Sequence, residues 1–173
     1  MNNDYILKLE QVSKSFPGVK ALDTVDFAVK RGTVHALVGE NGAGKSTLIK
    51  IISGVYAPTS GSVLLDGKAC RFHNPRQALD RGIVVIHQEL SIANDLTVAE
   101  NIYLGCEPRI QNGFFLDRKK MEADAQAILD FMEVDILSTA VARHLTAAQQ
   151  QMVEIAKVIS KNAQVVIMDE PTS

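Results

Sequence analysis

The sequence predicts an α/β fold in which a central, mostly parallel sheet with helices is joined by a small antiparallel β subdomain and a helical subdomain. Three observations predict this class. Apolar and polar residues alternate over residues 5–30, as in antiparallel strands with one solvent-exposed face. An apolar run at 34–38 leads through a glycine-rich turn into a helical segment at 48–52. A second apolar run, 165–168, ends in two carboxylates, as expected for a central strand of a parallel sheet.

The antiparallel sheet is expected to begin with residues 5–30 and to be extended by a later strand. Val63 and Leu65 alternate with polar neighbours after Ser60-Gly61, and Asp66-Gly67 is a hairpin-turn signal. The alternating apolar positions of the first segment are Leu7, Leu9, Val12, Val25, Phe27 and Val29.

Three helices have recognisable starts. Asn74-Pro75 supplies a cap and a first-turn proline, and residues 97–100 form a capping box that opens a helix through Leu104. From Asp117 onward, apolar residues at helical spacing predict an amphipathic helix that packs on the core. Between these helices, residues 105–116 are expected to form a mobile loop.

The glycine-rich turn fits the pattern Gly-x-x-x-x-Gly-Lys-Ser/Thr. A strand, such a turn and a helix start place backbone N–H groups around one anion, and the positive end of the helix adds to their attraction. We expect Lys45 to reach the β and γ phosphates of a nucleotide and the Ser46 hydroxyl to ligate the Mg²⁺ that bridges them. The alternative is a glycine-rich turn that merely contains Lys-Ser. The predicted nucleotide-binding residues are Gly39, Asn41, Gly42, Ala43, Gly44, Lys45, Ser46 and Thr47.

The acidic pair after the second apolar run indicates hydrolysis. Ligands of parallel sheets bind at the carboxyl ends of the strands. Asp169 is predicted to hold Mg²⁺, directly or through water, and Glu170 to orient or deprotonate the water that attacks the γ-phosphate. The alternative is that these two acids simply end a strand at the surface.

With those sites placed, the chain from Leu7 to Ser173 resembles the ATP-binding cassette family, the ATPase subunits of ABC transporters. The resemblance implies a P-loop NTPase fold of the ABC ATPase type, with ATP and Mg²⁺ as cofactors. Phe16 lies where such cassettes place an aromatic ring that stacks on adenine, the alternative being a core phenylalanine. Gln88 matches the family's Q-loop glutamine, which reaches the Mg²⁺ site and is linked to the membrane partner. Taken alone, Gln88 is an ordinary polar strand end.

Residues 145–149 stand where the family carries its signature, Leu-Ser-Gly-Gly-Gln, and here both glycines are alanines. Thr146 and Gln149 also form a capping box for a helix, which is the simpler interpretation and is compatible with the first. The resemblance implies that Thr146, Ala147, Ala148 and Gln149 complete the nucleotide site of a second cassette. Alanine keeps the N–H donors but adds Cβ atoms, which leaves open a competent but altered, or an asymmetric, composite site.

Within the family, the chain is most similar to the monosaccharide importer ATPases of the ribose, xylose and galactose type. The segments that carry this similarity are 87–90, 96–105 and 151–157. Such proteins usually carry two cassettes in tandem, so we expect this chain to be part of the first, truncated after the Walker B strand and incomplete as a catalyst. The expected division is an ATP-binding core with the antiparallel sheet, at about 1–95 and 160–173, and a helical signature region at about 96–159.

Composition excludes several other classes. Lys plus Arg is 18 and Asp plus Glu is 20, a formal charge of −2, which gives no electrostatic case for nucleic-acid binding. No apolar run approaches the roughly 18 residues of a membrane span, so we expect no direct membrane insertion. Cys70 and Cys106 form no metal or disulfide pattern and are expected to be reduced thiols.

The function expected from this resemblance is an ATP-binding and ATP-hydrolysing subunit that powers sugar import. Its expected partners are transmembrane permease subunits, through them a sugar-binding protein, and a second cassette for the ATP sandwich. Its expected location is the cytoplasm, peripheral on the inner face of the cell membrane. The alternatives are a fragment that binds ATP without turnover and a soluble, non-transport ABC ATPase.

Overall fold

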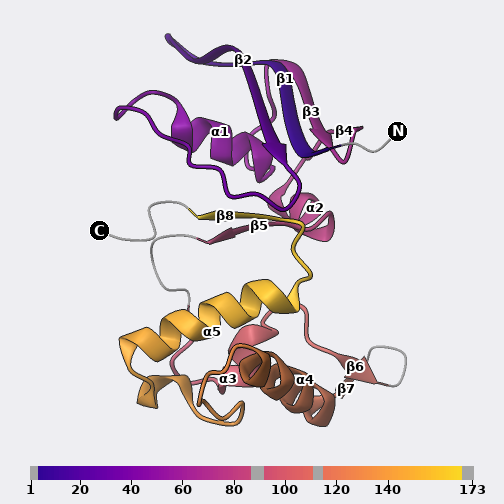
Figure 1. Cartoon of the computed structure of the whole chain (residues 1–173), viewed down its shortest axis with the longest axis vertical. Coiled ribbons are helices and arrows are strands. Elements are labelled where there is room, and N and C mark those ends of the chain that lie inside the picture. The colour runs from indigo at the N-terminus through magenta and orange to yellow at the C-terminus, as the bar shows by residue number, and fades with distance from the viewer. Residues whose placement is uncertain (1–3, 87–91, 111–114, 169–173) are drawn as a thin grey trace. The chain divides into compact units, whose positions relative to one another are not determined.

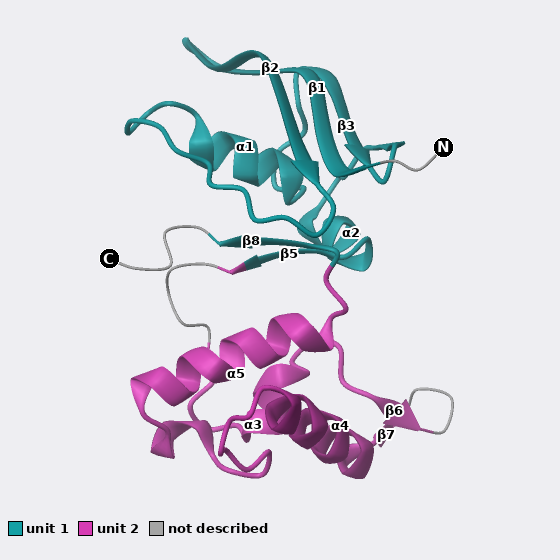
Figure 2. Cartoon of the chain, viewed as in Figure 1, with its two compact units in different colours: residues 1–85, 164–169 teal, residues 86–163, 170–173 magenta. Residues whose placement is uncertain are grey.

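The structure, a computed structural model, describes residues 4–86, 92–110 and 115–168. The chain divides into two compact units (Figure 2). Unit 1 comprises Met1–Val85 and Gln164–Asp169, and unit 2 comprises Ile86–Ala163 and Glu170–Ser173. The long segment Ile86–Ala163 of unit 2 is therefore an insertion between the two segments of unit 1.

Unit 1 contains the predicted antiparallel sheet. Its strands are β1 (Tyr5–Phe16), β2 (Val19–Lys30), β3 (Ser60–Leu65) and β4 (Lys68–Cys70), in the order β2-β1-β3-β4. Leu9 of β1 pairs with Phe27 on one side and with Val63 on the other. Because alternate side chains point to opposite faces of a strand, Leu7, Leu9 and Val12 share the buried face that the sequence predicted, with a register shift between Leu9 and Val12.

Two helices accompany this sheet in unit 1. Helix α1 (Lys45–Ile52) lies alongside the sheet (Figure 1) and buries Leu48, Ile51 and Ile52 in the same core as the strands. Helix α2 (Pro75–Asp80) begins as predicted, because the Asn74 side chain accepts a hydrogen bond from the Gln77 N–H and proline occupies the first position.

A separate two-stranded sheet pairs β5 (Ile83–Ile86) with β8 (Val165–Met168). Their starts are tied together, because the N–H groups of Gln164 and Val165 both donate to Gly82 O, at 2.8 and 3.0 Å. The two strands run in the same direction (Figure 1), as expected for a parallel sheet. The expectation that the second apolar run is buried throughout was wrong: Val165 is buried, but Val166 is 42% and Met168 56% exposed. Alternate side chains of β8 therefore differ in burial at its start, Val165 lying in the core of unit 1 and Val166 being exposed.

The prediction of a strand at residues 34–38 was also wrong. Residues 33–40 have no regular secondary structure, and Val34 and Val38 are 100% and 88% exposed. A strand exists only where a neighbouring backbone accepts and donates its hydrogen bonds. Within the described parts of the chain no strand pairs with this segment, so its apolar sequence alone does not make it a strand.

Unit 2 is built on three helices, α3 (Val98–Ile102), α4 (Arg118–Phe131) and α5 (Ala147–Ser160), with a short 3₁₀ turn, η2 (Ala142–His144), before α5. The capping boxes predicted at Thr97 and Thr146 are both present. Helix α3 ends before the expected Leu104. The core shared by the three helices comprises Val98, Ala99, Ile102, Met121, Ala125, Leu129, Val153 and Ala156. No helix of the described residues is long and apolar enough to cross a membrane.

The segment expected to be a loop at 105–116 contains a short hairpin. Strand β6 (Arg109–Ile110) pairs antiparallel with β7 (Phe115–Leu116), with Arg109 opposite Leu116 and Ile110 opposite Phe115. All four of these side chains are exposed. The hairpin therefore owes its strands to backbone pairing and contributes nothing to the core of unit 2.

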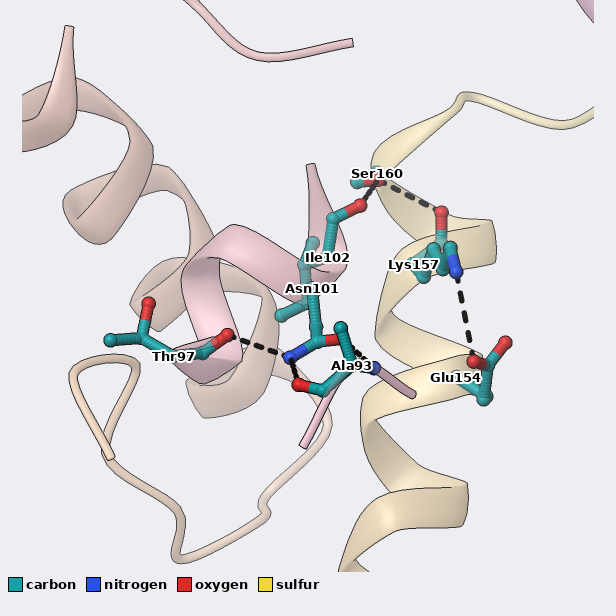
Figure 3. A network of polar contacts seen from close by, with 7 residues as sticks. All are labelled: Ala93, Thr97, Asn101, Ile102, Glu154, Lys157 and Ser160. Carbon is teal, nitrogen blue, oxygen red and sulfur yellow. Dashed lines mark hydrogen bonds and ion pairs between the residues drawn. The ribbon is translucent and has the colours of Figure 1, made fainter. Parts of the chain in front are cut away.

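A buried amide holds the start of unit 2 together (Figure 3). Asn101 is 0% exposed, and its Oδ1 accepts from the Ala93 N–H at 2.8 Å. Its Nδ2 donates to Ala93 O and to Thr97 O, both at 3.0 Å. Nearby, the Ser160 hydroxyl bonds Lys157 O at 2.8 Å and Ile102 O at 3.4 Å, which links the ends of α5 and α3. The buried Asn101 amide thus hydrogen-bonds partly buried backbone groups of the segment that leads into α3.

Replacing Asn101 by alanine should destabilise unit 2. Removing the amide leaves the partly buried N–H and C=O of Ala93 without these hydrogen bonds and opens space at a fully buried position, so the free energy of unfolding should fall by about 1–3 kcal/mol. Urea unfolding followed by circular dichroism measures this change. As a control, Gln151→Ala at an exposed site of α5 should change stability by less than about 0.5 kcal/mol. Equal stability of the Asn101→Ala and native proteins would contradict a stabilising role for this amide.

Candidate functional site: a phosphate-binding loop

The predicted phosphate loop leads directly into α1, and Gly44 is the residue that makes this junction. Gly44 caps the helix in the left-handed conformation, with φ of 89°. A Cβ on Gly44 would lie 2.7 Å from Ala21 O and 2.7 Å from Leu22 Cδ2, both on β2. A side chain is therefore excluded by backbone conformation and by lack of space.

The loop before Gly44 is open to solvent. Gly42 has φ of 87°, and a Cβ on it would meet nothing within 4 Å. Glycine is therefore favoured here by the backbone conformation and not by lack of space. The Ala43 N–H donates to Glu40 O at 3.1 Å and closes the turn. Asn41, Gly42 and Ala43 are exposed. The loop backbone is thus accessible to a ligand.

The start of α1 has the electrostatics of an anion site. The first N–H groups of a helix have no acceptor within the helix and carry its partial positive charge. The first turn of α1 holds no acidic residue that would compensate this charge. A phosphate group fits both the donors and the charge.

Lys45 is half-buried, and its ammonium is turned back onto the loop. Lys45 Nζ donates to Gly39 O at 2.6 Å and to Glu40 O at 3.0 Å. An ammonium has three donors, so one remains available after these two bonds. Lys45 is therefore positioned over the loop that the sequence predicted it to serve.

Ser46 and Thr47 follow in the first turn of α1, and Ser46 is exposed. A hydroxyl oxygen is a suitable ligand for Mg²⁺, which prefers oxygen donors. The described residues contain no group of three His, Cys, Asp or Glu side chains that gathers as a metal site. The predicted carboxylate ligand Asp169 and the predicted ligand Gln88 lie outside the described residues, as does Glu170.

The structure does describe the two strands that precede Gln88, Asp169 and Glu170 in the sequence. Strand β5 ends at Ile86 and β8 at Met168, and the two are neighbours in the parallel sheet. Gln88 follows the first strand in the sequence, and Asp169-Glu170 follows the second. The carboxyl ends of neighbouring parallel strands form one edge of a sheet, the edge where ligands of such folds bind.

Phe16 lies at the end of β1 and is half-buried, outside the buried core of unit 1. Its ring meets the Tyr56 ring edge-on, with centroids 5.3 Å apart and an interplanar angle of 72°. The ammonium of Lys14 lies over the Phe16 ring, 5.2 Å from its centroid. Sequence reasoning singled out Phe16 but missed Tyr56 and Lys14, since no motif marks either of them.

The signature segment belongs to unit 2 and is a helix start, as the simpler interpretation predicts. The Gln149 N–H donates to Thr146 Oγ1 at 3.3 Å, and the Thr146 N–H donates to Gln149 Oε1 at 2.9 Å. Thr146, Ala147 and Ala148 are exposed, so the N-terminal end of α5 is accessible. The role of these residues in the site of a second cassette stays a prediction.

Comparison with known proteins places the chain in a family. Residues 22–173 match the ABC transporter family. The chain is 55% identical over 97% of its length to a ribose/galactose/methyl galactoside import ATP-binding protein of Agrobacterium fabrum. It is 53% identical over 99% of its length to a ribose import ATP-binding protein of Streptomyces avermitilis. The chain spans about a third of the length of these relatives, 33% in each case.

A solved structure shows the same fold. The crystal structure of a nucleotide-free ATP-binding cassette from an ABC transporter matches 98% of this chain and 70% of its own, with a TM-score of 0.81 and 30% identity. The sequence match, this structural match and the phosphate loop agree. The chain belongs to the ABC transporter family, and its fold is that of an ATP-binding cassette.

Proposed function

We propose that this chain is the ATP-binding and ATP-hydrolysing part of an ABC importer of sugars. The observation that supports it most is the junction of the phosphate loop with α1, where Gly44 excludes a side chain and Lys45 lies over the loop. The names of its relatives, which import ribose, galactose or methyl galactoside, support the sugar class. The chain would use ATP and Mg²⁺.

Binding of the triphosphate follows from the loop. The N–H groups of residues 42–47 and the positive end of α1 would surround the β-phosphate, and Lys45 would exchange its bonds to Gly39 O and Glu40 O for phosphate oxygens. Ser46, Asp169 and Gln88 would hold Mg²⁺, which neutralises charge between the β and γ phosphates. Phe16 would stack on the base.

Hydrolysis would need residues from two chains or two cassettes. Glu170 would orient the attacking water and accept its proton. The exposed start of α5, from Thr146 to Gln149, would present its N–H groups to the γ-phosphate held by the second cassette.

The proposed partners follow from this assignment. Permease subunits would carry the sugar and receive it from a sugar-binding protein, and the cassette would act at the inner face of the membrane without inserting. The surface that contacts the permease would include Gln88 and the segment 97–105, where Leu104 is exposed. A second candidate function is ATP binding without turnover, which the alanines at 147 and 148 favour, because they replace the signature glycines.

Replacing Lys45 by alanine should weaken Mg-ATP binding about 10- to 100-fold, because hydrogen bonds to charged groups contribute about 1.5–3 kcal/mol. Titration calorimetry measures the affinity. Lys30→Ala, an exposed lysine at the end of β2, is the matched control and should bind as the native protein does. Unchanged affinity of a folded Lys45→Ala variant would show that the loop is structural only.

Replacing Phe16 by alanine should weaken ATP binding by about 1–3 kcal/mol, the scale of base stacking on an aromatic ring. Inorganic triphosphate carries no base, so its affinity should not change. Competition titrations of both ligands separate the two effects. If the native protein bound ATP and triphosphate equally well, stacking on Phe16 would be ruled out.

Replacing Glu170 by glutamine should abolish phosphate release while Mg-ATP still binds, because an amide cannot accept the proton from water. The expected loss is about 10²–10⁴-fold. The assay uses a chain extended to the length of its relatives and paired with a second cassette, with residues 1–173 alone, expected to turn over slowly, alongside. Glu10→Gln, an exposed acid on β1, is the control. Brisk hydrolysis without Glu170 would refute its role as base, and binding without any release by the native pair would favour the binding-only function.

A further inference from the structure

Four side chains gather where β1 ends, and we call them the aromatic–lysine cluster: Lys14, Phe16, Lys50 and Tyr56. The rings of Phe16 and Tyr56 pack edge to face at 5.3 Å. The Lys14 ammonium lies 5.2 Å from the centroid of Phe16 and 5.5 Å from that of Tyr56. The Lys50 ammonium lies 5.6 Å from the Tyr56 centroid. Tyr56 therefore contacts every other member of the cluster.

The position of Tyr56 is set by α1. The N–H groups of Val55 and Tyr56 both donate to Lys50 O, at 2.8 and 3.0 Å, in the last turn of the helix. The turn between them is confined at Gly54, where a Cβ would lie 2.8 Å from Asn74 O and 2.8 Å from Phe72 Cβ. Helix α1 begins at Lys45, so one rigid element carries the phosphate loop at its start and Tyr56 just beyond its end.

The segment after Tyr56 is also bound to the end of β1. Lys14 Nζ donates to Ala57 O at 2.8 Å. The Thr59 N–H donates to Ser13 O at 2.8 Å, and the Ser15 N–H donates to Thr59 Oγ1 at 3.1 Å. The strand that carries Phe16 and the segment that carries Tyr56 are thus joined by three hydrogen bonds next to the ring contact, between residues 13–15 and 57–59, which limits the movement of Tyr56 relative to Phe16.

We propose that Tyr56 is a positioning residue for the nucleotide base: it holds the Phe16 ring at a fixed place relative to the phosphate loop. This inference rests on the proposed function. A ring held in its binding orientation loses less conformational entropy when a base stacks on it, so the base binds more tightly. Without Tyr56, Phe16 would remain present but would have to be ordered by the ligand.

The experiment compares two ligands across a set of variants. Affinities for Mg-ATP and for Mg-triphosphate are measured by calorimetry for the native chain and for Tyr56→Leu, Tyr56→Phe, Phe16→Ala and the double variant Phe16→Ala/Tyr56→Leu. Tyr5→Leu, a tyrosine at the other end of β1, is the matched control. Circular dichroism and thermal unfolding verify that each variant is folded.

The expected result is a selective loss for the base-bearing ligand. Tyr56→Leu should weaken ATP about two- to tenfold, the range that an aromatic pair contributes, and should leave triphosphate unchanged. Tyr56→Phe keeps the ring and should bind ATP as the native chain does. In the Phe16→Ala background, Tyr56→Leu should have no further effect, because its target is already absent.

Three outcomes would overturn the proposal. Tyr56→Leu could bind ATP as tightly as the native chain while Phe16→Ala binds it weakly, or it could weaken ATP equally with and without Phe16, or it could weaken triphosphate as much as ATP. In each case Lys45 and Phe16 keep their assigned roles. Failure of the proposed function itself looks different, because the native chain would then bind neither ATP nor triphosphate. If Tyr56→Leu did not fold, Tyr56→Met, which keeps apolar volume but has no ring, would take its place, and native-like ATP affinity of folded Tyr56→Met would overturn the proposal.

Discussion

The close approach of the Gly44 backbone to β2 is the constraint on which the site in unit 1 depends. With a side chain at this position the loop would have to move away from Ala21 O and Leu22, and the left-handed φ would be strained. Helix α1 buries Leu48, Ile51 and Ile52, so its direction is fixed by the core. The turn at Gly44 therefore has to fit between α1 and β2, which are both packed in that core.

Lys45 links the two ends of the phosphate loop. Its ammonium donates hydrogen bonds to two loop carbonyls, Gly39 O and Glu40 O. In the proposed binding mode a triphosphate would replace those two bonds, and the free energy of binding would be the difference between the two sets of contacts rather than the full strength of the new ones. The exposed backbone at Asn41 to Ala43 would be accessible to such a ligand.

Unit 2 reaches its order by polar contacts at helix ends. Thr97 and Thr146 each form a capping box, and the Asn101 side chain hydrogen-bonds backbone groups of the segment before α3. Helix α3 is too short to be stable alone, so its existence depends on these caps and on the core shared with α4 and α5. The start of α5 is both capped and exposed, which suits a surface that is proposed to bind a phosphate of another cassette.

The sequence by itself determined the local features: the glycine-rich turn before α1, the alternating strands and the capping boxes, because each depends on residues that are neighbours in the chain. It did not determine whether 34–38 is a strand, since that requires a partner strand distant in sequence, nor that β8 has one exposed face. Contacts between distant residues, such as Tyr56 with Phe16 and Gly44 with β2, were decided by the tertiary structure alone. Local hydrogen bonds and steric limits act within a few residues, whereas packing selects partners that only the folded chain brings together.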